Sequence, residues 1–160
     1  MIIDISKLKN GSEINIEVNE VINVDKETLK KVNVLDIKNA SVSGYIHDDE
    51  MQNYYLDLLV TGTMVLPCSV TLQPVDYPFE TKIEGDYSEM MSEIGDFGEK
   101  VKNCIDIFPI IWENILMEIP IKVTCPDATD LKLSGDGWKL VTEGEEQEQT
   151  SAFDKLKDLL

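Results

Sequence analysis

A long alternation of apolar and polar side chains is the feature that most restricts the fold of this 160-residue chain. From residue 54 onward, apolar side chains recur at every second position, at Tyr54, Leu56, Leu58 and Val60. Side chains of a strand repeat their direction every two residues, so this spacing predicts a strand with one buried and one exposed face. Gly62 lies within the run and predicts a bulge or a bend there.

Other short segments have the β-branched and alternating character of strands. They are residues 2–5, 13–18, 32–37, 40–46 and 77–83, with a further strand-like pair at Val70 and Leu72. Asp25 is a candidate N-cap of a turn or short helix between two of them. Six to eight strands joined by short connections predict a mostly antiparallel sheet, and its closure into a barrel is left open.

One strong helix is predicted after Asp106, which can cap it. Pro109 falls in the first turn, where its missing N–H is tolerated, and Pro120 ends the helix. Its apolar stripe consists of Phe108, Ile111, Trp112, Ile115, Leu116 and Ile119. A stripe of this width is typical of a helix that packs on a sheet. The predicted fold class is therefore α+β, with a mostly antiparallel sheet covered by one main amphipathic helix.

The predicted organisation is a single domain over residues 1–142, an acidic linker over 143–150 and an amphipathic tail over 151–160. Residues 85–102 within the domain predict a flexible acidic loop with a short helical turn around 88–94. In the tail, Phe153, Leu156 and Leu160 recur at helical spacing and are candidate partner-binding residues. Ten residues form a marginal helix in isolation, so the tail either docks on its own domain or folds onto a partner.

The charge balance restricts the class of partner. The chain has 31 acidic residues and 14 basic ones, all lysine, which gives a net charge of −17. A broad nucleic-acid-binding face needs clustered cations, and arginine is the preferred reader of phosphate and guanine. The field of this chain suits a basic protein partner better, although high charge also serves plain solubility.

The cysteine and histidine pattern favours neither a metal site nor a nucleophile. Cys68, Cys104 and Cys125 are an odd and widely spaced set, which is typical of a reducing cytosol and not of a disulfide framework. Structural zinc needs four ligands in paired short spacings, and no cysteine here has such a neighbour. The single histidine, His47, stands among residues 48–50, whose carboxylates would favour its charged form. We therefore predict no catalytic, cofactor-binding or metal-ligating residues and no enzyme activity.

The N-terminal segment has no secretory leader, and no apolar run is long enough for a membrane span. These features predict a cytoplasmic protein that does not bind a membrane.

Three segments together resemble the YceD family, the large ribosomal RNA subunit accumulation proteins. They are GTMVLPCSVTLQPVDYPFE at 62–80, IDIFPIIWENILMEIPIKVTC at 105–125 and SAFDKLKDLL at 151–160. The residues that carry the family pattern are Cys68, Leu72, Pro74, Asp106, Pro120 and Cys125. Thr71 stands where the family usually has the second cysteine of Cys-x-x-Cys. The metal-ligand cysteines found in many relatives are largely lost, so the resemblance implies no metal here.

The resemblance implies a non-enzymatic role in large ribosomal subunit biogenesis, through accumulation or processing of its ribosomal RNA. Together with the charge, it predicts a basic ribosomal protein or a pre-50S particle as partner, with only weak contact to RNA. The expected contact elements are residues 86–99, 143–148 and 153–160. One alternative is direct RNA binding through a local patch formed by Lys7, Lys9, Lys30 and Lys31. A less favoured alternative is a degenerate metal-binding module.

Overall fold

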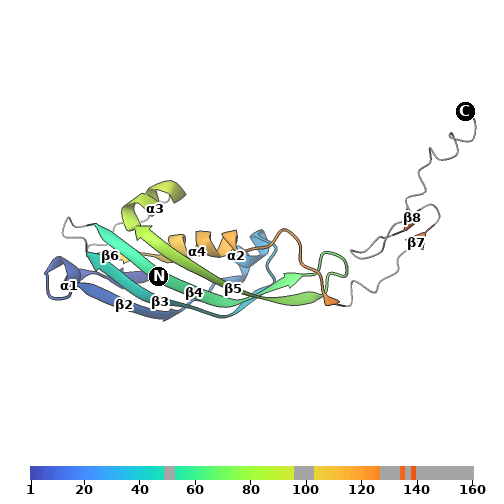
Figure 1. Cartoon of the computed structure of the whole chain (residues 1–160), viewed down its shortest axis with the longest axis horizontal. Helices are drawn as coiled ribbons and strands as arrows, with labels where there is room; N and C mark the ends of the chain where they lie inside the picture. Colours follow the sequence, from blue (N-terminus) through green and yellow to red (C-terminus); the bar gives the residue numbers. More distant parts are fainter. Residues whose placement is uncertain (49–52, 96–102, 127–133, 136–137, 140–160) are drawn as a thin grey trace, which may run out of the picture.

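A four-stranded antiparallel sheet is the main element of the computed structural model, which describes residues 1–48, 53–95, 103–126, 134–135 and 138–139. Its strands lie side by side in chain order (Figure 1). They are β2 (Asn15–Val21), β3 (Asp36–Asp48), β4 (Tyr54–Pro67) and β5 (Pro74–Asp86). Two strand pairs complete the described strands. These are β1 (Ile2–Asp4) with β6 (Cys104–Asp106), and β7 (Ser134–Gly135) with β8 (Trp138–Lys139).

Four helices accompany these strands in the described part of the chain. They are α1 (Ser6–Lys9), α2 (Lys26–Lys31), α3 (Tyr87–Ile94) and α4 (Phe108–Met117). Figure 1 shows α2 and α4 on one side of the sheet. The predicted α+β class with a mostly antiparallel sheet is confirmed, and the sheet is not closed into a barrel. Strands β2 and β5 are its two edges, and β5 carries Pro74 and Pro78, which have no backbone N–H to offer a further strand.

The alternation predicted from Tyr54 to Val60 is observed in β4, and beyond it residues 64–66 are buried in succession. Tyr54, Leu56, Leu58 and Val60 are buried, whereas Tyr55 and Leu59 between them are exposed. The buried set joins one hydrophobic core with side chains from the neighbouring strands and from α4. One face of the sheet therefore lies in the core, and we call the opposite face the outer sheet face.

The strands predicted at 32–37 and 40–46 correspond to one strand, β3, which begins only at Asp36 and contains a bulge; residues 32–35 are the turn after α2, where Asn33 has a φ of 59°. Lys38 pairs with Thr63 and Ser41 pairs with Thr61, so two residues of β3 stand opposite Gly62. This extra residue reverses the alternation, because the partly buried Ile37 before it is at an odd position, whereas the buried positions after it are even. A Cβ on Gly62 would lie 2.9 Å from the Phe79 ring, so only glycine leaves room for that ring. The bend predicted at Gly62 is thus a bulge whose extra residue belongs to the neighbouring strand.

The strand prediction for Val70 and Leu72 differs from the structure. Val70 and Leu72 do not form a strand, because residues 68–73 are the loop between β4 and β5. Leu72 has a φ of 60°, which is incompatible with an extended strand. The short helical turn predicted around 88–94 within the acidic segment 85–102 is confirmed as α3, whose N-terminus is capped by Asp86. Its carboxylate accepts hydrogen bonds from the backbone N–H groups of Ser88 and Glu89, as an N-cap should.

The predicted main helix is observed as α4. Its buried side chains are Ile110, Ile111 and Ile115, and α4 packs against α3 and β5. Ile110 was not part of the predicted stripe, so the buried face of the helix is wider than predicted on that side. The helix ends at Met117, three residues before Pro120. Asp25 is confirmed as an N-cap, since its carboxylate accepts the Thr28 backbone N–H at 2.8 Å.

We predict that Ile115→Ala lowers the free energy of unfolding by about 2–5 kcal/mol, because it leaves a cavity in the core. The matched control is Met117→Ala in the same helix, where the side chain is 75% exposed. That change should stay within about 0.5 kcal/mol. Urea unfolding of both variants measures the difference, and equal losses would contradict the packing described for α4.

Candidate functional site

The loop between β4 and β5 holds three of the residues that carry the family pattern: Cys68, Leu72 and Pro74. Cys68 is fully buried, with an exposed fraction of 0%. Its backbone N–H donates to the Gln73 carbonyl at 2.8 Å, and its own carbonyl accepts the Leu72 N–H at 3.0 Å. Pro74 then begins β5. The loop is a tight turn that places the Cys68 sulfur inside the protein.

A second segment brings Cys125 to this turn. The Ser69 N–H donates to the Val123 carbonyl at 2.8 Å, which holds the two segments together. The Cys125 N–H donates to the Cys68 Sγ at 3.3 Å, and the Thr71 N–H donates to the same sulfur at 3.4 Å. The Thr71 Oγ1 lies 3.3 Å from the Cys125 Sγ. Thr71 therefore occupies a position between two cysteines that are 57 residues apart in the sequence.

Hydrogen bonds at this turn change the acidity of a buried thiol. They lower the pKa of Cys68 from an ordinary value of 9.0 to about 6. The Thr71 side chain has the largest effect, followed by the backbone N–H groups of Thr71 and Cys125. Burial opposes the shift, because it penalises the thiolate. Donors that converge on one sulfur thus favour its charged form at neutral pH.

The donors gathered here do not fit a structural zinc ion. Such an ion takes four nitrogen or sulfur ligands, and only Cys68 and Cys125 contribute sulfur at this turn. Cys104 lies in the β1–β6 pair, and His47 lies in β3 on the outer sheet face. Within the described residues, no three His, Cys, Asp or Glu side chains are placed to share a metal ion. The hydroxyl of Thr71 replaces the sulfur of a third possible ligand.

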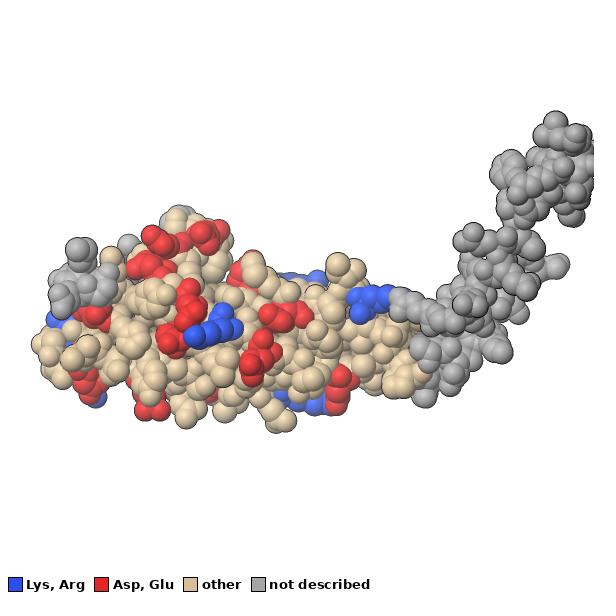
Figure 2. Space-filling model, viewed as in Figure 1, with Lys and Arg blue, Asp and Glu red and all other residues tan. Residues whose placement is uncertain are grey.

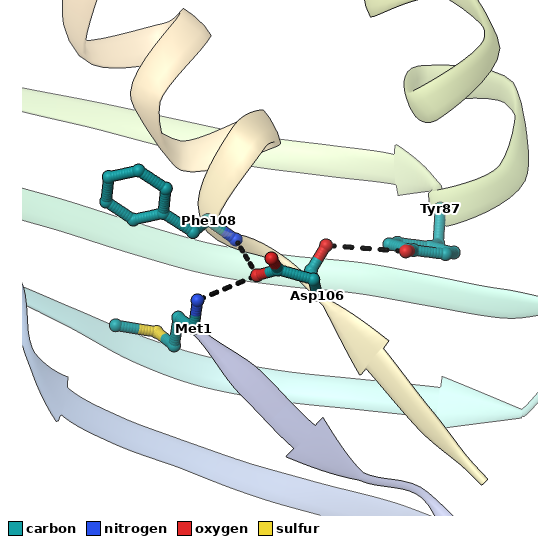
Figure 3. A network of polar contacts seen from close by, with 4 residues as sticks. All are labelled: Met1, Tyr87, Asp106 and Phe108. Carbon is teal, nitrogen blue, oxygen red and sulfur yellow. Dashed lines mark hydrogen bonds and ion pairs between the residues drawn. The ribbon is translucent and has the colours of Figure 1, made fainter. Parts of the chain in front are cut away.

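Asp106 lies away from this turn and makes contacts that join separate elements of the fold (Figure 3). Its Oδ1 accepts the Phe108 N–H at 3.0 Å at the start of α4, and lies 2.7 Å from the Met1 ammonium. Its backbone carbonyl accepts the Tyr87 hydroxyl at 3.3 Å. One carboxylate thus joins the beginning of β1 to the beginning of α4. Pro120, the other pattern residue of this region, follows the end of that helix.

Carboxylates dominate the described surface. None of the described charged residues is buried as a whole, so their acids lie outside the core. Figure 2 shows acidic side chains over α3 and along β5, with one small group of basic atoms among them. Three lysines are already paired with acids. Lys7 contacts Glu13 at 2.8 Å, Lys38 contacts Asp76 at 2.8 Å and Lys82 contacts Glu84 at 2.6 Å.

The four lysines predicted as a possible RNA patch are not brought together. Lys7 and Lys9 belong to α1, whereas Lys30 and Lys31 belong to α2. Figure 1 shows these two helices in separate parts of the molecule, with α4 between them in the view. No local pattern in the sequence reveals this separation, because it depends on the tertiary fold.

Several predicted contact residues lie outside the described residues. They are the positions 96–99 of the acidic segment, the linker 143–148 and the tail residues Phe153, Leu156 and Leu160. The part of the acidic segment that the structure describes forms α3, and its Glu89 and Glu93 add to the surface charge.

A family model described as large ribosomal RNA subunit accumulation protein YceD matches residues 56–160. The uncharacterized protein YlbN of Bacillus subtilis (strain 168) is 26% identical over 151 residues. That similarity covers 88% of this chain and 84% of YlbN. No solved structure matches the chain. Among the described residues, no helix is both long enough and apolar enough to cross a membrane.

We predict that Thr71→Val raises the pKa of Cys68 from about 6 toward its ordinary 9.0, because the variant loses the side chain that lowers it most. The thiolate ultraviolet absorbance followed against pH measures this, with the Cys68→Ser titration subtracted to remove the other cysteines. Thr61→Val is the matched control, since Thr61 lies in β4 beside Ser41 and away from this turn. A midpoint that stays near 6 in Thr71→Val would contradict the assignment.

The same shift predicts a pH dependence of stability. Because the folded pKa of Cys68 lies below its ordinary value, its thiolate stabilises the fold most at pH values above 9. This stabilisation is lost as the pH falls to about 6. Urea unfolding of the parent and Cys68→Ser across this range should show their difference in stability decreasing toward the acid end.

Proposed function

The chain belongs to the YceD family, and from this premise we propose that it is a non-enzymatic factor in large ribosomal subunit biogenesis. It supports the accumulation or processing of large-subunit ribosomal RNA by binding a basic ribosomal protein, free or on a pre-50S particle. The site of this action is the cytoplasm, where subunits are assembled.

The observation that carries this proposal is the charge of the surface. The net charge is −17 without a single arginine, and the described acids are all outside the core. A surface of this kind repels the phosphate backbone at long range and attracts cationic polypeptides. Electrostatic steering accelerates such an encounter about 10- to 1,000-fold at low salt. Ribosomal proteins that await assembly carry the cationic segments that match this field.

The state of the lysines also favours a protein partner over RNA. Lys7, Lys38 and Lys82 each contact a carboxylate, so their charge is already compensated within the protein. RNA binding requires cations that release counterions from phosphates, and a paired lysine contributes little to that release. The expected contact elements remain the acidic segment that begins with α3, the linker 143–148 and the tail 153–160.

We predict that the immobilised full-length chain retains one or a few basic proteins from RNA-free large-subunit ribosomal proteins at about 50 mM salt. Retention should fall steeply by about 500 mM salt, because the Debye length shrinks with ionic strength. Mass spectrometry identifies the retained proteins, and an acidic protein of equal charge without the family pattern is the control. Retention that is equal on the control, or absent at low salt, would refute the proposal.

A gel-shift of the same chain with large-subunit ribosomal RNA tests the alternative that the protein binds RNA directly. We expect no shift at about 50 mM salt, where phosphate contacts are strongest. A tight, salt-sensitive shift would support direct RNA binding instead.

A further inference from the structure

The outer sheet face combines aromatic rings with carboxylates in register across four strands. Tyr45 of β3 stands opposite Glu17 of β2 on one side and opposite Asp57 of β4 on the other. Asp57 in turn stands opposite Glu84 of β5. One row across the sheet therefore presents a tyrosine among three carboxylates. Tyr45 is 44% exposed, so its ring is available to a partner.

The adjacent row extends the aromatic part of this surface. The rings of Tyr45 and His47 are stacked, with centroids 6.2 Å apart and planes at 20°. His47 pairs across the strands with Tyr55, which is also 44% exposed. We call Tyr45, His47 and Tyr55 the aromatic patch, and Glu17, Asp57 and Glu84 the acidic rim. Tyr45 and Tyr55 are not part of the hydrophobic core on the opposite face of the sheet.

Resting on the function proposed above, we propose that the aromatic patch and the acidic rim are the docking surface for a lysine- and arginine-bearing segment of the basic partner. The face of a tyrosine ring attracts ammonium and guanidinium groups, and a neighbouring carboxylate can pair with the same cation. Glu17 lies directly beside Tyr45, and Asp57 and Glu84 share the single cation Lys82, so the surface has more carboxylates than cations to offer an incoming segment.

The charge of this surface favours a basic segment as its occupant over RNA and over a second copy of the chain. Beside the rim, Glu80 and Asp86 of β5 lie on the same face, and Lys82 is the one basic residue among them. Lys82 contacts Glu84 at 2.6 Å and Asp57 at 3.7 Å, whereas Glu17 has no ion pair within the described part of the chain. Phosphates of RNA meet repulsion here despite the exposed rings. A second copy of the chain would bring two acidic surfaces together.

Two charge reversals on one strand test the proposal. Glu17 and Glu20 both belong to β2 and both are exposed. Glu17 is on the outer sheet face, whereas Glu20 pairs with the buried Val42 and stands on the opposite side. Glu17→Lys and Glu20→Lys change the net charge equally and so weaken the long-range field equally. Only Glu17→Lys alters the acidic rim.

The measurement is the dissociation constant between each full-length variant and the basic proteins retained from RNA-free large-subunit ribosomal proteins. Glu17→Lys should weaken binding about 10-fold or more, and Glu20→Lys about 2-fold or less. The double variant Tyr45→Ser/Tyr55→Ser, which keeps the charge, should also lose about 10-fold. Circular dichroism and thermal unfolding check that each variant is folded. If the double variant unfolds, the two charge reversals still decide the matter.

The outcomes separate this inference from the proposed function. Equal weakening by Glu17→Lys and Glu20→Lys would mean that only the overall field acts, which overturns the docking surface and leaves the proposed function standing. No binding by the parent chain would overturn both. A gel-shift with ribosomal RNA that Tyr45→Ser/Tyr55→Ser abolishes, together with unchanged binding of the basic proteins by that variant, would overturn the docking surface in favour of base stacking.

Discussion

Burial of a single face of the β2–β5 sheet is the constraint on which the rest of this structure depends. The inward side chains of β4 and the isoleucines of α4 enter one common core. Each fully buried side chain of this kind contributes about 1.5–3 kcal/mol. Because α2 and α4 cover one side, the other side of the sheet is left mainly to polar and aromatic residues, with Leu59 and Val21 as exposed aliphatic exceptions. The surface available for recognition is thus a direct result of how the core is built.

The sequence predicts those elements whose pattern is local. The alternation of β4, the stripe of α4 and the cap at Asp25 all depend on neighbours within one strand or one helix. The bulge in β3 could not be recognised, because its effect on alternation resembles a break between two strands. The proximity of Cys68 and Cys125 and the row that joins Glu17 to Tyr45 depend on register and on long-range packing. No spacing along the chain carries that information.

The residues of the family pattern and the residues of the proposed docking surface have different physical roles. Cys68, Thr71 and Cys125 form the junction of two segments, and Asp106 joins the start of β1 to the start of α4. These positions maintain the shape of the fold. The proposed docking surface consists instead of side chains such as Glu17 and Tyr45, for which no hydrogen bond to the core is described. The residues that maintain the shape of the fold are therefore separate from those of the proposed docking surface.

The prolines of β5 have a consequence for how copies of the protein behave when crowded. An exposed sheet edge is a template onto which another chain can add a strand, and this is how many proteins form fibres. Pro74 and Pro78 interrupt the ladder that such an addition would need. Unlike electrostatic repulsion, this protection does not weaken when counterions accumulate around the protein. Strand β5 therefore remains a poor template for strand addition even at ionic strengths that screen the charge of the surface.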